Sequence, residues 1–300
     1  MIENNVILAK ESISDENGNT EINEVRPLSD DEIEEYNQQK NIMVEFANDF
    51  MLVEYVKLNY ESLIDLLEET VIQVAESPTM MGPYPFKNFP FLLNTRILNY
   101  MMSVKTLLDH METNINRKHG EQSNEFIDFK ALLSHEYDNY FSYRFMYRLR
   151  NFVQHCGMPP LTYTASKSLD EANSKLSVEL NVYFLRDQLI RKFSKWGSQV
   201  KSEIIQMEEE FPILPILNEH VNTIYKIFVS YNEKYNLPKC LYAKESIVKF
   251  IGEKDDYVGD EYIIAKFESV ESGLSLRKIT IPTSSFIKIT DFYKIKDGLL

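Results

Sequence analysis

The sequence has few of the residues on which cross-linked or phosphate-binding folds depend. Its 300 residues include two cysteines and nine glycines. Two cysteines exclude a disulfide scaffold and are typical of a reducing compartment. The glycines form neither G-x-G-x-x-G nor G-x-x-x-x-G-K, so the familiar phosphate-binding loops are excluded. H-E-x-x-H, G-x-S-x-G and zinc-spaced groups of cysteine and histidine are also absent, and we expect no metal and no cofactor.

Long apolar runs are missing as well. No segment approaches the roughly 20 apolar residues that span a bilayer. The first residues lack the basic start and apolar core of a signal peptide. We therefore expect a cytoplasmic protein with no membrane partner.

The charge is acidic overall but unevenly placed. The net charge of −14 argues against a protein that coats nucleic acid with its whole surface. Residues 1–40 hold eleven acidic and three basic residues, whereas residues 140–201 hold ten basic and four acidic ones. A basic segment inside an acidic protein is compatible with a confined site for a polyanion such as RNA. The alternative is chance clustering on a solvated face.

Hydrophobic periodicity predicts a mainly α fold, a helical bundle with a β-hairpin insertion and a small β-containing C-terminal region. A capping box at Ser29–Glu32 begins the first helix, which a break near 58–60 would divide. Alternating residues predict a hairpin, and the last sixty residues are expected to be mainly β. The helices are expected over 29–75, 91–117, 124–156, 185–211 and 217–236, with a short helical turn at 247–251; the strands are expected over 161–167, 176–184, 261–268, 276–281 and 285–290.

These elements suggest four parts of the chain. Residues 1–28 are interpreted as an acidic mobile tail or a single peripheral strand, and residues 29–160 as the helical bundle. Residues 161–238 would add the hairpin and two helices packed on the bundle, and residues 239–300 a small α+β region. The loop at 77–90 is expected to fold its aromatic residues back onto the core: Tyr84, Phe86, Phe89 and Phe91.

The stretch Tyr143–Pro160 carries the strongest functional pattern. Its helix should end at Gly157, because glycine is favoured at a C-cap and Pro159 and Pro160 forbid continuation. Phe141, Phe145, Leu149 and Phe152 recur at helical spacing and mark a buried face. A polar stripe with no acidic residue follows steps of four, three and four beside that face, and Arg150 and Gln154 border it: Arg144, Arg148, Asn151 and His155.

The segment R-N-F-V-Q-H, from Arg150 to His155, resembles the R-x(4–6)-H signature of HEPN domains (higher eukaryote and prokaryote nucleotide-binding). The residue after the arginine is usually polar in that family, and Asn151 matches. The longer pattern R-N-[FY]-x-Q-H-C-G-x-P is similar to that of a bacterial group of such proteins. The resemblance covers about residues 30–160. An upstream helix of the family often turns a polar residue toward the motif, and the candidates are Asn99, Ser103 and Asp109.

The resemblance implies a metal-independent endoribonuclease, of a kind common among toxins and anti-phage defence effectors. Two protomers would pack their motif helices together into a composite cleft. His155 would exchange protons with the ribose 2′-OH or the leaving 5′-oxygen, and Arg150 would hold the phosphate. Asn151 would orient His155 or the phosphate, and the product would carry a 2′,3′-cyclic phosphate. Arg144, Arg148 and Gln154 would contact RNA.

Three alternatives remain beside this interpretation. Arg150 and His155 could serve folding, through an ion pair and a helix cap. The bundle could be a non-catalytic HEPN-like module that dimerises or binds a nucleotide or a protein. A third alternative is a component of a larger complex that docks through the acidic residues 1–28.

Overall fold

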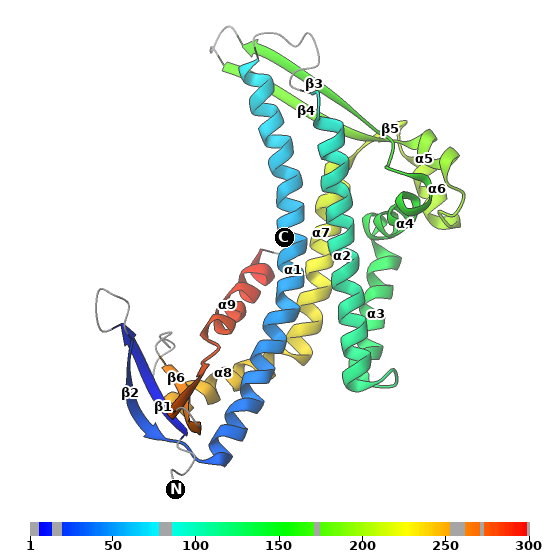
Figure 1. Ribbon diagram of the computed structural model, residues 1–300. Coiled ribbons are helices and arrows are strands. Elements are labelled where there is room, and N and C mark those ends of the chain that lie inside the picture. The colour runs from blue at the N-terminus through cyan, green and yellow to red at the C-terminus, as the bar shows by residue number, and fades with distance from the viewer. Residues whose placement is uncertain are drawn as a thin grey trace. The chain divides into compact units, whose positions relative to one another are not determined.

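A computed structural model describes residues 6–13, 20–77, 86–170, 175–252, 262–270 and 273–298. These residues are mostly helical, with nine helices and two small antiparallel sheets (Figure 1). The prediction of a mainly α fold is confirmed at this level. No helix of the described segments combines the length and the apolar character that a membrane span requires.

The chain divides into two compact units. Unit 1 contains the described residues up to 50 and those from 232 to 298, and unit 2 contains residues 51–231. This division differs from the parts expected from the sequence, because two long helices contribute residues to both units: α1 (Asp30–Glu76) and α7 (Ile213–Tyr235).

Unit 1 contains a four-stranded antiparallel sheet in the order β2-β1-β6-β7. The structure thus differs from the mobile tail expected for residues 1–28, since 6–13 and 20–27 are strands. The sheet buries small and β-branched residues on one face: Ile7, Ala9, Ile263 and Ala265. The strands are β1 (Val6–Ile13), β2 (Thr20–Pro27), β6 (Tyr262–Val270) and β7 (Gly273–Thr280).

The helical segments of unit 1 are the start of α1, the last residues of α7, α8 (Leu237–Ile251) and α9 (Thr283–Asp297). The predicted capping box is confirmed, because the Ser29 N–H donates to Glu32 Oε2 at 2.9 Å and the Glu32 N–H donates to Ser29 Oγ at 3.3 Å. Tyr36 of α1 stacks on Phe250 of α8 with ring centroids 5.0 Å apart. The strand predicted at 285–290 is wrong, since these residues lie in α9, and the short turn at 247–251 is the end of the longer α8.

Unit 2 is built around three helices that run side by side (Figure 1). They are the second part of α1, α2 (Phe89–His119) and most of α7. Tyr60 of α1 donates its hydroxyl to Asn218 Oδ1 of α7 at 2.7 Å. Tyr60 also packs against Tyr100 of α2, with ring centroids 6.0 Å apart. The break expected near residues 58–60 does not occur, because α1 is continuous over 47 residues.

The predicted hairpin is confirmed. β3 (Leu161–Asp170) pairs with β4 (Lys175–Leu185), and β5 (Glu210–Pro212) extends the sheet. The alternation is visible in β4, where Val182 and Phe184 are buried while Asn181 is exposed. Tyr163 of β3 packs against Phe86 and Phe89, as expected, whereas Phe91 is 73% exposed, so its predicted return to the core is wrong. Tyr84 lies outside the described residues.

The helix predicted over 124–156 is two helices, α3 (Asn124–Asn139) and α4 (Phe141–Cys156). Tyr140 between them is extended, with φ −117° and ψ 120°. The carbonyl oxygen of Tyr137 takes no N–H from the next turn and instead accepts Arg144 Nη1 at 2.6 Å. The guanidinium group of Arg144 therefore supplies the hydrogen-bond donor that the Tyr137 carbonyl group requires at this break.

The helix predicted over 185–211 is likewise divided, into α5 (Arg186–Lys192) and α6 (Ser198–Gln206). Between them Gly197 has φ +82°, a conformation that residues with a Cβ rarely adopt. The intervening residues Phe193 and Trp196 are buried. They hold this segment against α4, as described next.

Candidate functional site

The motif helix α4 forms as the sequence predicts. Phe145, Leu149 and Phe152 have no exposed surface, and Phe141 is half-buried. Gly157 follows the last turn with φ +91°, which confirms the predicted C-terminal stop. The buried face fixes the rotation of α4 and thereby the direction of every motif side chain.

An aromatic cluster joins α4 to the α5–α6 segment. Trp196, the only tryptophan, stacks on Phe145 with ring centroids 5.7 Å apart and on Phe152 at 5.8 Å. Its indole Nε1 donates to the carbonyl oxygen of Leu189 at 3.1 Å. Burial of several aromatic rings is worth about 1.5–3 kcal/mol for each side chain. This cluster places α5 beside the end of the motif helix.

Arg144 is not available for RNA in this arrangement. Its side chain is 5% exposed, and Nη2 lies 2.5 Å from Glu203 Oε1 of α6. Nη1 donates to the Tyr137 carbonyl oxygen. The motif has no acidic residue of its own, and Glu203 of α6 supplies the acidic partner of Arg144. In this structure Arg144 thus forms an ion pair within the protein in place of the expected contact with RNA.

Arg148 is half-buried beside the tyrosines of α3 and α4. Its Nη2 lies 3.4 Å from Tyr137 Oη, and its guanidinium group lies 5.7 Å from the ring centroid of Tyr147. A Cβ at Gly197 would approach the same guanidinium group at 3.5 Å. Arg148 therefore lies between α3 and the α5–α6 segment.

Arg150 lies on another side of α4. It lines a small cavity of about 40 Å³ with Tyr143, Met146, Lys105 of α2 and His220 of α7. Its buried Nε has no hydrogen-bond partner, and the side chain forms no ion pair with a described residue. At about 100° per residue, five residues turn Arg150 about 140° away from His155 around the helix.

The last turn of α4 is open. Gln154 and His155 are exposed and Asn151 is half-buried, and none of the three side chains forms a hydrogen bond or ion pair with a described residue. The neighbouring Cys156 thiol donates to the carbonyl oxygen of Lys192 at 3.2 Å, so the ends of α4 and α5 touch.

This contact places the end of α4, where His155 lies, against a segment that carries exposed basic residues. Arg191, Lys192 and Lys195 are exposed, and no ion pair joins them to any residue that the structure describes. Arg191 and Lys192 lie in the last turn of α5, and Lys195 lies in its connection to α6. The sequence predicted this whole segment as one uninterrupted helix. We call the following residues the α4–α5 basic surface: Gln154, His155, Arg191, Lys192 and Lys195.

The candidates on α2 do not reach the motif. Asn99 and Ser103 line a groove together with Tyr55 and Asn59 of α1. Asp109 pairs with Lys105 on its own helix. The sequence predicted that Asn99, Ser103 and Asp109 support the motif, whereas in the structure they face α1 or solvent.

Across the segments that the structure describes, histidine, cysteine and acidic residues form no group of three or more suited to a metal ion. No family model, curated protein or solved structure matches the chain.

Proposed function

We propose that the protein is a HEPN-type, metal-independent endoribonuclease that binds RNA at the α4–α5 basic surface. The observation that supports this most directly is that α4 and α5 meet one residue after the exposed His155, where the Cys156 thiol contacts Lys192, in a segment whose exposed Arg191, Lys192 and Lys195 form no ion pair with a described residue. In a protein with net charge −14, a group of uncompensated cations favours a polyanion at that surface.

The chemistry needs only groups present in the chain and the RNA. The ribose 2′-oxygen attacks the adjacent phosphorus while the bond from phosphorus to the 5′-oxygen breaks. His155 takes the 2′-OH proton or returns a proton to the leaving 5′-oxygen. Arg150 stabilises the charge on the non-bridging oxygens, and Asn151 orients the imidazole or the phosphate. The products are a 2′,3′-cyclic phosphate and a 5′-OH.

The angular separation of Arg150 and His155 on α4 favours a composite site. Side chains about 140° apart on one helix do not readily contact one phosphate. In a homodimer that packs the two α4 helices together, Arg150 of one protomer would face His155 of the other. Such an enzyme would act as a toxin or anti-phage effector, with a protein partner holding it inactive.

One observation favours a second function, a non-catalytic HEPN-like module that dimerises or binds a nucleotide or protein. The Arg144–Glu203 ion pair shows that part of the motif stripe serves the fold. The remaining cations would then bind an anion without cleaving it.

Cleavage of labelled structured RNA in EDTA separates the two functions. We expect the wild type to leave cyclic phosphate ends and His155→Ala to leave none. The matched control is His110→Ala, because His110 is an exposed histidine of α2 and not part of the motif. Equal cleavage by wild type and His155→Ala would reject this site, and binding without cleavage would support the module.

A mixing experiment tests the composite site. Arg150→Ala and His155→Ala protomers should each be inactive, whereas a mixture should regain activity, because a heterodimer has one site with both residues intact. Inactivity of the mixture, with heterodimers shown to form, would contradict sharing of the site.

The salt dependence of binding tests the surface independently of cleavage. Removing Lys192 and Lys195 together should lower affinity for single-stranded RNA and reduce the slope of log K against log salt by about 0.7 per lost contact. Lys57→Ala is the control, because Lys57 lies on α1 and pairs with Glu61. An unchanged slope in the double variant would place RNA elsewhere.

A further inference from the structure

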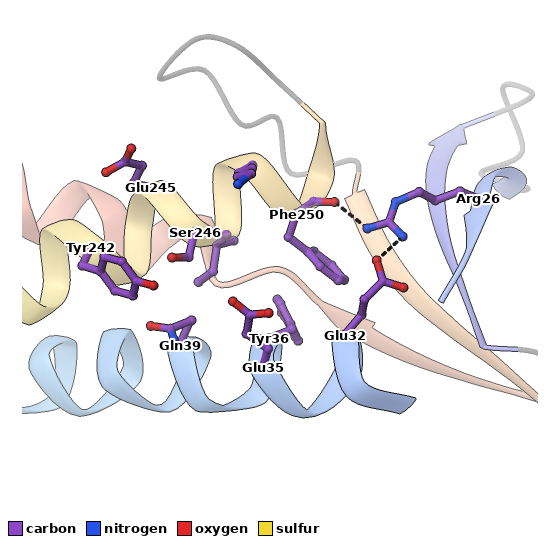
Figure 2. Close-up of a pocket in the computed structure, with 11 residues that line it drawn as sticks. Arg26, Glu32, Glu35, Tyr36, Gln39, Tyr242, Glu245, Ser246 and Phe250 are labelled. Carbon is purple, nitrogen blue, oxygen red and sulfur yellow. Dashed lines mark hydrogen bonds and ion pairs between the residues drawn. The ribbon is translucent and has the colours of Figure 1, made fainter. Parts of the chain in front are cut away.

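A second candidate site lies within unit 1 and does not depend on the proposed ribonuclease activity. The start of α1 and the length of α8 enclose a pocket of about 380 Å³ (Figure 2). We call it the α1–α8 pocket. This volume is sufficient for a small organic ligand or one long side chain.

One end of the pocket already holds a guanidinium group, that of Arg26. Its Nη1 lies 2.6 Å from Glu32 Oε1, and its Nη2 donates to the carbonyl oxygen of Phe250 at 3.0 Å. The same group lies 5.2 Å from the ring centroid of Phe250. A carboxylate, a carbonyl oxygen and an aromatic ring together form the environment that a guanidinium group prefers.

A carboxylate, a carbonyl oxygen and an aromatic ring recur farther along α1 and α8, but there no described side chain binds to the two acceptors. Glu35 and Gln39 point from α1 toward α8, and Tyr242 points from α8 toward α1 (Figure 2). Gln39 Oε1 is buried and has no hydrogen-bond partner, and Glu35 pairs with no described residue. A buried acceptor without a donor costs roughly 1–3 kcal/mol. Tyr242 is 61% exposed.

The spacing of the two acceptors suits a forked donor. Residues four apart on a helix lie about 6 Å apart along its axis. A guanidinium group presents five N–H donors in a fixed plane, so it can donate to both sides at once and stack its face on a ring. The ionisable residues of the lining leave one net negative charge: Glu32, Glu35 and Glu245 against Arg26 and Lys249.

We propose that the α1–α8 pocket binds an alkylguanidinium cation, held by the Glu35 carboxylate and Gln39 Oε1 and stacked on the Tyr242 ring. The cation is either a free small molecule or an arginine side chain of a peptide.

Isothermal titration of the full chain with agmatine tests the proposal. We expect a dissociation constant on the order of 1 mM for so small a ligand. Glu35→Gln should weaken it at least about tenfold by removing a charge-assisted bond while preserving shape. Glu34→Gln is the matched control, because Glu34 is exposed on the same helix and does not line the pocket.

Two further probes identify the class and source of the cation. Spermidine carries amines but no guanidinium group, and it should bind more weakly than agmatine. The blocked peptide Gly-Arg-Gly should bind more tightly than agmatine if the source is a peptide, and more weakly if the source is a free cation. The proposal would be overturned if agmatine did not bind at concentrations up to 20 times the expected dissociation constant. It would also be overturned if wild type and Glu35→Gln bound agmatine with equal affinity.

Discussion

The hydroxyl oxygen of Tyr100 lies 2.7 Å from Nδ1 of His220 in the centre of unit 2. The rings meet edge to face, with centroids 5.6 Å apart. Burial away from water lowers the pKa of His220 to about 3 and raises that of Tyr100 well above its usual value. His220 is therefore a neutral hydrogen-bonding residue of the core.

The first prediction concerns the pH dependence of stability. Well above pH 6.5 the imidazole is neutral in both the folded and the unfolded chain. As the pH falls from 7 to 5, the unfolded state gains a proton that the folded state refuses, because its pKa is about 3. The free energy of unfolding should therefore fall by about 2 kcal/mol. Urea titrations at pH 7, 6 and 5 measure this free energy of unfolding.

Two variants separate His220 from the other titrating groups. His220→Gln should be less stable at pH 7 but should lose much less on going to pH 5. His110→Gln changes an exposed histidine and should keep the wild-type slope. A wild-type slope in His220→Gln would mean that His220 does not govern this pH range.

The second prediction concerns Arg144. Arg144→Met preserves much of the packing but leaves Glu203 unpaired and the Tyr137 carbonyl oxygen without its donor. We expect the free energy of unfolding to fall by about 2–4 kcal/mol. Arg191→Met should change it by less than about 0.5 kcal/mol, because that side chain is exposed and forms no ion pair with a described residue.

A double variant tests the cause of this loss. Arg144→Met with Glu203→Leu removes both charges and should recover part of the stability, since the cost of the single change comes largely from the partner left behind. If Arg144→Met cost no more than a surface ion pair, about 0.5 kcal/mol, the pair would have no structural role.

The third prediction concerns the two thiols. Burial raises the pKa of Cys240 to about 12, whereas Cys156 is partly exposed at the end of α4. Because the thiolate is the reactive form, a disulfide reagent at pH 8 should label one thiol in the native protein and the second only in denaturant. Cys156→Ser should abolish the native reaction. Equal rates for both thiols would contradict the burial of Cys240.

The sequence predicted elements well where periodicity and stop signals agreed. Ser29 and Glu32 do form a capping box, and Gly157 does end the motif helix. The hairpin alternation of β4 is likewise visible in its buried residues. In each case the deciding interactions lie within a few residues of one another, which is the range that pattern analysis covers.

Some breaks and helices depend on distant partners that sequence patterns do not indicate, such as Glu203 of α6, which pairs with Arg144 59 residues earlier. The extended residue Tyr140 divides α3 from α4 with neither glycine nor proline nearby, and the break is stabilised by Arg144. In α9, β-branched residues suggested a strand, but Phe286, Ile289 and Phe292 are buried at spacings of three. Tertiary packing therefore overrode local propensity.

The candidate site was predicted only in part. At the end of α4, Gln154 and His155 are exposed and Asn151 is half-buried, whereas Arg144 is paired with Glu203. Arg191, Lys192 and Lys195 were noted only as part of a basic segment. The position of their segment against the end of α4 depends on the packing of Phe152 against Phe193 and Trp196, and no spacing in the sequence indicates it.

The sheet of unit 1 has a consequence for synthesis on the ribosome. Leu8 of β1 pairs with Ile264 of β6, 256 positions later. At roughly 5–20 residues per second, β1 waits about 10–50 s for this strand, while the segment forming unit 2 emerges in full. Through that interval the nascent β1–β2 hairpin has an open edge, which invites pairing with another chain. The sheet of unit 1 can therefore be completed only after the whole of unit 2 has been synthesised.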